Sequence, residues 1–391
     1  MRCVFGVLLC CTLAFALQAG AADPLNTTPV LEKKLIEYGW DVPATDFIRQ
    51  HIREMEQRPF DGLIFRLKGG TNALEPAAWT EAQFAADYDN LANIQWGKFT
   101  DNFVAMLAAS NQDWCDDAQW ANIEKNLALV ARMGRVGKCV GICFDPEPYG
   151  TNPWDYRITA HKSERGFAEY EAKVCERGAQ FIRAIEKELP QPKILSFYEF
   201  ALFRSLCAPM APEERRQKLS EHDYALYPAF LNGILDAASP GVVLIDGNEN
   251  AYYYTNAEQY FSAYHLITQS ARYLVDPALW GKHRSQCQAG QALYVDQYFG
   301  LRADPVLGNF MTPEERPKWF EHNVYWALQS TDQYVWCYSE KMNWWTNTDV
   351  PPGAEDAIRN ARTKVTSGQP LDFDLQPLVQ EATQRQKAAT T

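Results

Sequence analysis

Short apolar segments that alternate with helix-like stretches run through almost the whole of this chain. Eight segments have the length and pattern of β-strands and cover residues 34–40, 61–67, part of 99–107, 138–144, 193–198, 242–245, 292–295 and 333–337. Stretches with a helical spacing of apolar residues lie between or after them, at 44–57, 116–133, 164–188, 223–238, 257–273, 312–329 and 355–365. The second strand is instead followed by a loop rich in Gly and Asn. This repeated strand–helix unit places the fold in the α/β class.

The number of units favours a closed barrel over an open sheet. Eight strands with helical connections are typical of a single-domain (β/α)8 barrel, also called a TIM barrel. A doubly wound sheet more often carries a Gly-rich turn after its first strand, and no Gly-x-Gly-x-x-Gly sequence is present. We predict that residues 23–368 form one catalytic barrel domain. The polar segment 369–391 is expected to be a loose tail.

The first 22 residues have the pattern of a secretory signal peptide. Arg2 is followed by the apolar run 4–17 and then by small residues up to Ala22, which suits a cleavage site. A lipoprotein signal at Cys10 or Cys11 is the alternative, but it would cut the apolar run short. No later stretch reaches the roughly 18 apolar residues of a membrane span. We therefore predict a secreted or periplasmic protein with no membrane attachment after cleavage.

The net charge of the chain limits the kinds of partner that it can bind. The net charge of −12 argues against nucleic acid, because such binding depends on neutralising phosphates. It leaves open an anionic sugar held in a local basic pocket, since four cations follow predicted strands: Arg66, Lys68, Arg302 and Lys341. Surface charges exposed to water are the alternative interpretation of these residues. We expect a monomer that acts on a carbohydrate.

The sequence lacks the usual patterns of a zinc site. It has no Cys-x-x-Cys and no His-x-His, and none of its six histidines lies in the inward phase of a predicted strand. Carboxylate-bound Ca²⁺ or Mg²⁺ stays open, because oxygen ligands are abundant. We predict no metal centre and no cofactor.

Acidic residues gather where the predicted strands end. In a parallel barrel these ends meet at one mouth, where barrel enzymes carry their catalytic groups. The residues at these positions are Trp40 and Asp41, Arg66 and Lys68, Asp101, Asp145 and Glu147, Tyr198 and Glu199, Asp246 and Glu249, Asp296, and Tyr338 and Glu340. This face carries more acidic residues than it would need merely to be solvated by water. Glycoside hydrolysis requires two carboxyls that flank the scissile bond.

The end of the fourth strand is the clearest candidate. Across 139–145 bulky residues alternate with small ones, which places Asp145 and Glu147 on the inner face. The same alternation turns Asp296 and Glu340, after the seventh and eighth strands, toward the barrel axis opposite the fourth strand. We predict Glu147 as the proton donor. The nucleophile or base is then one of Asp145, Asp296 and Glu340, and all four acids line one pocket.

Aromatic residues cluster near the same strand ends. Flat apolar rings suit the C–H faces of sugars. The rings that we predict to bind substrate are Trp40, Tyr149, Trp154, Tyr198, Tyr298, Tyr338, Trp344 and Trp345. Each of them has an alternative place in the apolar core, where aromatic residues are also common.

The predicted architecture resembles the broad group of secreted (β/α)8 glycoside hydrolases over nearly the whole mature chain. Within it, residues 140–147 resemble the strand-four signature of chitinase-like enzymes, Asp-Gly-x-Asp-x-Asp-x-Glu. The matching positions are Gly141, Asp145 and Glu147. Val140 and Cys143 stand where that signature has acids, which counts against an N-acetyl-assisted mechanism.

Other strand-end patterns leave the family open. The Asn-Glu pair that many retaining β-glycosidases carry on strand four is absent. An Asp after strand four with a Glu after strand five resembles α-glycan enzymes and implies a pair of Asp145 and Glu199. We predict a glycoside hydrolase that cleaves a polysaccharide or glycan with two carboxyls. The alternatives are a metal-dependent hydrolase or lyase on the same barrel and a non-catalytic carbohydrate-binding barrel.

Overall fold

Parallel strands form the centre of the structure, a computed structural model that describes residues 31–108 and 111–390. All of its helices and strands belong to one unit, Lys33–Thr391. The predicted signal peptide, residues 1–22, lies outside the described residues. Within those residues no helix is both long enough and apolar enough to span a bilayer.

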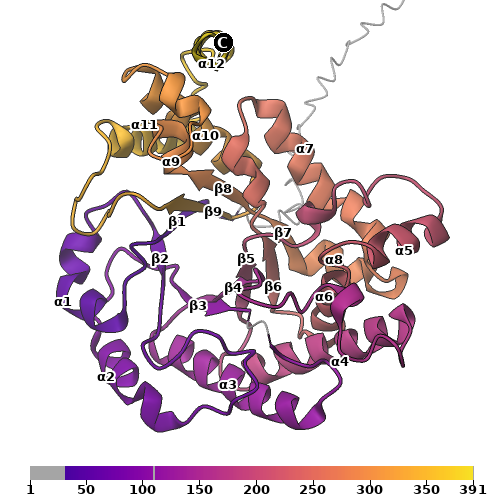
Figure 1. Cartoon of the computed structure of the whole chain (residues 1–391). Coiled ribbons are helices and arrows are strands. Elements are labelled where there is room, and N and C mark those ends of the chain that lie inside the picture. Colours follow the sequence, from indigo (N-terminus) through magenta and orange to yellow (C-terminus); the bar gives the residue numbers. More distant parts are fainter. Residues whose placement is uncertain (1–30, 109–110, 391) are drawn as a thin grey trace, which may run out of the picture. The chain divides into compact units, whose positions relative to one another are not determined.

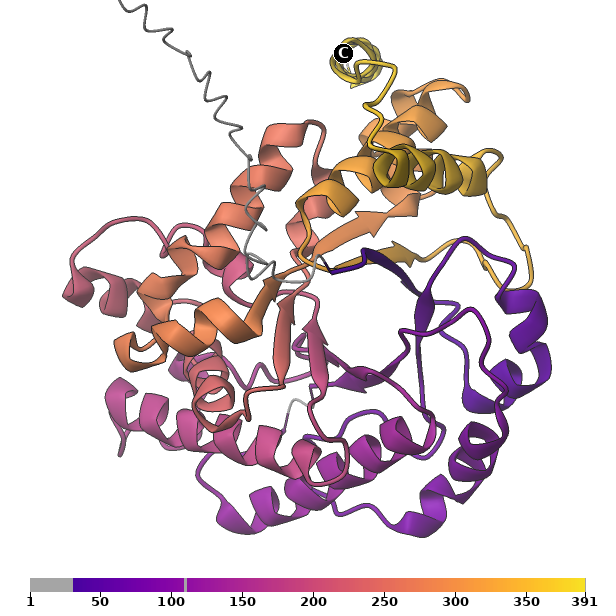
Figure 2. The ribbon, with the colours of Figure 1, turned by 180° about the vertical axis from the view of Figure 1, so that it is seen from behind.

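Nine parallel strands of the described chain surround the barrel axis (Figure 1, Figure 2). They are β1 (Lys34–Gly39), β2 (Gly62–Phe65), β3 (Phe103–Leu107), β4 (Gly141–Asp145), β5 (Lys193–Ser196), β6 (Val243–Asp246), β7 (Cys287–Ala289), β8 (Gln291–Tyr294) and β9 (Tyr334–Ser339). Neighbours follow the order β7-β6-β5-β4-β3-β2-β1-β9-β8, and every pair is parallel. Only Gly290 separates β7 from β8 in the chain. One interrupted strand therefore pairs with β6 through its first part and with β9 through its second, which completes a (β/α)8 barrel.

Helices cover the outside of the strands (Figure 1, Figure 2). They are α1 (Thr45–Met55), α2 (Ala85–Asn93), α3 (Asp117–Val136), α4 (Phe167–Glu186), α5 (Pro212–Ser220), α6 (Tyr227–Ala237), α7 (Ala257–Thr268), α8 (Trp280–Gln286), α9 (Val295–Phe299), α10 (Glu315–Ser330), α11 (Ala354–Ser367) and α12 (Gln376–Thr390). Helices α4 and α6 approach closely at two glycines: a Cβ on Gly178 would lie 2.1 Å from the Phe230 carbonyl oxygen, and one on Gly233 would lie 1.9 Å from that of Cys175. Any larger residue at either glycine would push the two helices apart.

The strand order confirms the predicted fold class. Each of the eight predicted strands overlaps an observed one; the seventh, 292–295, overlaps β8, and β7 was not predicted. The Gly290 N–H donates to the Asp246 carbonyl oxygen at 2.8 Å, which ends the pairing with β6. The sequence did not predict α2, α5, α8, α9 or α12, because these helices are short or carry few apolar residues.

Alternation along β9 shows how the barrel interior is filled. Trp336 Nε1 donates to the Gly247 carbonyl oxygen at 2.9 Å, and Tyr334 OH donates to Asp101 Oδ1 at 2.6 Å. Lys34 on β1 lies 3.6 Å from Asp101. The contacts of Tyr334 and Lys34 with Asp101 fill the end of the barrel where the strands begin, whereas Trp336 reaches Gly247, which follows the end of β6. The pocket lies at the other end, where the strands finish.

The C-terminal segment corrects the expectation of a loose tail over 369–391. Helix α12 occupies most of it, and Leu375 and Ala382 are buried. Arg385 forms an ion pair with Glu315 of α10 at 2.8 Å. The polar composition hid this helix, because a few small apolar residues are enough to hold one face against the protein.

Candidate active site

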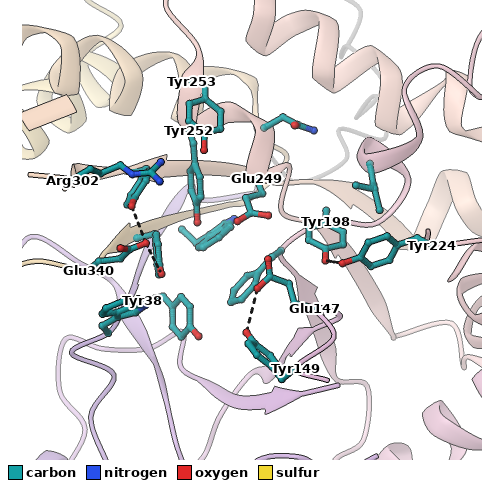
Figure 3. Close-up of a pocket in the computed structure, with 17 residues that line it drawn as sticks. Tyr38, Glu147, Tyr149, Tyr198, Tyr224, Glu249, Tyr252, Tyr253, Arg302 and Glu340 are labelled. Atoms are coloured by element: carbon teal, nitrogen blue, oxygen red, sulfur yellow. Dashed lines mark hydrogen bonds between the residues drawn. The ribbon is translucent and has the colours of Figure 1, made fainter. Parts of the chain in front are cut away.

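A pocket of about 520 Å³ opens where the strands end. Eight of its lining residues are tyrosines, three are glutamates and one is an arginine. The complete lining is Tyr38, Trp40, Glu147, Tyr149, Phe197, Tyr198, Leu202, Tyr224, Glu249, Asn250, Tyr252, Tyr253, Tyr294, Arg302, Trp336, Tyr338 and Glu340. Figure 3 shows their side chains directed toward one space. The predicted location of the site, at the carboxyl ends of the strands, therefore agrees with the pocket.

The end of β4 supplies a linked group of two acids and a tyrosine. Asp145 Oδ1 accepts the Glu147 N–H at 2.8 Å, and Asp145 Oδ2 accepts the Tyr149 hydroxyl. That hydroxyl also lies 3.3 Å from Glu147 Oε2. Burial raises the pKa of Asp145 to about 7; the Tyr149 hydrogen bond opposes this, and the charge of Glu147 adds to it. Asp145 is only 1% exposed, so it supports Glu147 from behind the pocket wall.

Glu340 lies across the pocket from Glu147 (Figure 3). It follows β9, and its Oε1 accepts the Tyr294 hydroxyl at 2.8 Å and the Tyr338 hydroxyl at 3.3 Å. Arg302 stands beside the same group, with its guanidinium 5.6 Å from the centre of the Tyr294 ring. Two hydroxyl donors and a nearby cation stabilise a negative charge on Glu340.

Besides Asp145, two further predicted site acids lie outside the pocket lining, Asp296 and Glu199. Asp296 is fully buried, and its carboxylate accepts the backbone N–H groups of Glu340 and Lys341 at 2.9 Å. The prediction that Asp296 faces the pocket is wrong, because the chain turns into α9 at Val295 and the strand alternation stops there. Glu199 is also fully buried; burial and the charge of Asp246 hold its pKa well above the usual range.

Glu249 is a pocket residue that the candidate set missed. It follows β6, lines the pocket with Glu147 and is half-buried. Burial raises its pKa to about 8, and the charges of Glu147 and Asp145 contribute further. Its place after a strand was visible in the sequence. Nothing in the sequence pattern distinguished it from Asp246, whose buried carboxylate accepts the backbone N–H groups of Ala201 and Asn248.

The predicted aromatic residues divide into two groups. Trp40, Tyr149, Tyr198 and Tyr338 line the pocket, and Trp40 and Tyr149 are 65% and 57% exposed, so their faces are open to a ligand. The other four are core residues, contrary to the prediction: Trp154, Tyr298, Trp344 and Trp345. Burial of these large rings against neighbours such as Phe60 stabilises the barrel and leaves no open face for a sugar.

The charges of the pocket do not favour an anionic sugar. Of the four cations that follow predicted strands, only Arg302 lines the pocket. Lys68 pairs with Asp46 at 2.6 Å, and Lys341 lies over the Trp40 ring at 4.7 Å. The pocket therefore offers an anionic sugar a single cation, beside three glutamates. In the part of the chain that the structure describes, no three His, Cys, Asp or Glu side chains are grouped to hold a metal ion.

Comparisons with known proteins leave the family of this chain open. No family model and no curated protein sequence matches the chain. A solved structure of GH5_18 from Streptomyces cattleya in complex with GlcNAc is 9% identical and has a TM-score of 0.46, with 88% of this chain and 83% of that chain covered. A Bacteroidetes-affiliated GH5 cellulase is 11% identical, with a TM-score of 0.44 and coverages of 90% and 95%. A GH18 chitinase from Pseudoalteromonas aurantia is 12% identical, with a TM-score of 0.38 and coverages of 84% and 100%.

These likenesses assign neither a family nor an activity to the chain. What its own strand order and pocket define is a class: a (β/α)8-barrel protein with an acidic, tyrosine-lined pocket at the mouth of the barrel.

Proposed function

We propose that this protein is a glycoside hydrolase that cleaves a polysaccharide or glycan in the pocket at the barrel mouth. The observation that carries the proposal is the placement of Glu147 and Glu340 on opposite sides of a pocket lined with tyrosines. Two carboxyls that flank a sugar are the minimum that glycoside hydrolysis needs. The exposed rings of Trp40, Tyr149 and Tyr253 at the rim suit the apolar faces of sugar units.

The two carboxyls take different roles in this proposal. Glu147 protonates the oxygen of the leaving sugar, and Asp145 holds the backbone N–H of Glu147 in place. Glu340 acts as the ionised nucleophile or base, because Tyr294 and Tyr338 donate hydrogen bonds to it. A separation of roughly 5 to 5.5 Å between reacting carboxyls gives retention of configuration, and one of roughly 6.5 to 9.5 Å gives inversion.

The sequence adds a location to this proposal. We propose that residues 1–22 are removed as a signal peptide and that the mature chain acts as a monomer outside the cytoplasm. An extracellular or periplasmic site would bring the enzyme to glycans too large to enter the cell. Mass spectrometry of the exported protein tests the cleavage after Ala22.

Sugar release from a panel of glycans tests the activity. The purified protein is incubated with neutral, amino-substituted and sulfated polysaccharides, and the products are separated by chromatography. Release from a neutral or amino polysaccharide is expected, and release from sulfated ones is expected to be weaker because of the acidic pocket. Binding to a glycan without release from any of them would favour the non-catalytic carbohydrate-binding barrel.

A further inference from the structure

The turn that follows β6 is built under strain. Asn248 adopts φ 44° and ψ 60°, a left-handed conformation that residues other than glycine rarely take. Before it, Gly247 leaves no room for a side chain, since a Cβ would lie 2.5 Å from the Ser196 carbonyl oxygen and 2.7 Å from Trp336 Nε1. Strained turns persist where the surroundings hold them, and they concentrate at functional sites.

Buried hydrogen bonds hold this turn. The Asn248 N–H donates to Asp246 Oδ1 at 3.1 Å, and Asn248 Nδ2 donates to Gln291 Oε1 at 2.7 Å. Trp336 Nε1, from the floor of the pocket, donates to the Gly247 carbonyl oxygen at 2.9 Å. Asp246, Asn248 and Gln291 are each at most 1% exposed. The residue after the turn, Glu249, is therefore fixed at its backbone by β5, β6, β8 and β9 together.

Glu249 enters the same pocket as Glu147 (Figure 3). Within the described residues its carboxyl has neither a hydrogen-bond donor nor a cation bound to it. By contrast, Glu340 accepts two tyrosine hydroxyls and stands beside Arg302. A half-buried carboxyl without a donor or a cation is best accommodated in its neutral, protonated form.

We propose that Glu249 and Glu147 form a proton-donating pair, in which Glu249 passes its proton to Glu147 while Glu147 protonates the leaving sugar. This inference rests on the proposed function. The proton on Glu147 goes to the glycosidic oxygen as the bond between that oxygen and the anomeric carbon breaks. The Glu249 proton then restores Glu147. The water that attacks the sugar supplies the hydroxyl of the second product, and its released proton returns to Glu249 through solvent.

The electrostatics of the pocket agree with Glu249 as the member of the pair that holds the proton. Burial first, and then the negative charges of Glu147 and Asp145, raise the pKa of Glu249 to about 8. The other titratable or charged groups that face it are Tyr198 and Tyr224 on one side, Tyr252 in its own turn, and Arg302 and Glu340 across the pocket. Glu249 therefore stays protonated up to mildly alkaline pH.

The pH profile and the leaving group together test the pair. Glu249→Gln is compared with Glu249→Asp and with Glu258→Gln, a matched change at an exposed glutamate on α7 that lies outside the pocket. For Glu249→Gln, kcat/KM on a natural glycan at pH 7.5 is expected to fall about 10- to 100-fold. The fall should be small on an aryl glycoside with an acidic leaving group, which needs little protonation.

The alkaline limb of the profile should move about one unit to lower pH, because the second carboxyl no longer holds the proton. Glu249→Asp should keep part of the activity, and Glu258→Gln should match the wild type.

Distinct results separate this inference from the proposed function. A wild-type pH profile and leaving-group dependence in Glu249→Gln would overturn the pair, while a loss of activity in Glu147→Gln would still support the hydrolase. Full activity in Glu147→Gln would overturn both. If Glu249→Gln does not fold, the wild-type protein with ¹³C-labelled glutamate provides the test by NMR. The pair requires a glutamate carboxyl that titrates near pH 8 in that protein. Absence of any such glutamate would overturn the inference.

Discussion

Asp296 holds Glu340 in place through the backbone: its Oδ2 accepts the Glu340 N–H at 2.9 Å. Its second oxygen accepts the N–H of the following residue, Lys341, at the same distance. A fully buried carboxylate thus fixes the turn after β9 from behind. The structure thereby places Asp296 outside the pocket lining, behind the turn that carries Glu340.

Loss of the Asp296 carboxylate should disturb Glu340 more than it disturbs substrate binding. In Asp296→Asn one carboxylate oxygen becomes an NH₂ group that faces a backbone N–H, so a donor meets a donor. We expect the free energy of unfolding to fall by about 1 to 3 kcal/mol and kcat to fall more than KM changes. Urea denaturation and steady-state kinetics measure both, with the exposed Asp236→Asn as the control. A stable variant with unchanged kcat would show that Asp296 does not position Glu340.

The Tyr294 hydroxyl should matter through Glu340. Tyr294→Phe removes the donor at 2.8 Å and leaves the weaker contact of Tyr338 at 3.3 Å. Since hydrogen bonds to a charged group contribute about 1.5 to 3 kcal/mol, we expect kcat to fall about 10-fold or more. Tyr88→Phe, at an exposed tyrosine of α2, serves as the control. Equal kinetics for the two variants would count against an ionised Glu340 in the reaction.

Asp145 should make stability depend on pH. Burial raises its folded-state pKa from 3.8 to about 7, so the folded protein holds this proton more tightly than the unfolded chain does. Between about pH 4 and pH 7 the free energy of unfolding should therefore fall as the pH rises, because folding then requires the uptake of a proton. Asp145→Asn removes this contribution and should flatten the fall. Urea unfolding at several pH values tests this expectation, and equal slopes for wild type and variant would contradict it.

Activity should survive chelation. Two carboxylates and a water molecule suffice for glycoside cleavage, whereas a metal-dependent hydrolase needs its ion to activate that water. We expect sugar release to be unchanged after treatment with EDTA and dialysis. The control follows folding by circular dichroism. A loss of turnover in protein that stays folded, with recovery on addition of Ca²⁺, Mg²⁺ or Zn²⁺ alone, would favour the metal-dependent rival.

The fold could be predicted because apolar residues repeat with different periods in strands and in helices. The end of β4 shows how far this kind of prediction extends to the site. Alternation along β4 directed attention to Asp145 and Glu147, of which Glu147 lines the pocket. The same rule failed for Asp296, because α9 begins at Val295 and a helical turn redirects the side chain. The alternation of residues along a strand does not show at which residue the strand ends.

Residues whose role depends on tertiary contacts lay beyond the sequence pattern. Glu249 reaches the pocket because Asn248 is held in a left-handed conformation by Gln291, which is 43 residues away in the chain. Trp154 and Trp344 are aromatic residues near strand ends, as Trp40 is, yet both are fully buried. Composition shows that rings are present, and only the packed structure shows which faces stay open.

The turnover of Glu147→Gln tests the central claim most directly. Gln keeps the size of the side chain and cannot donate the catalytic proton. On an unactivated glycan that the wild type cleaves, we predict that kcat/KM falls about 10²- to 10⁴-fold, while circular dichroism and thermal unfolding stay close to those of the wild type. Glu258→Gln, measured in parallel, should keep full activity. Undiminished cleavage by a folded Glu147→Gln would remove Glu147 from the mechanism and contradict the account.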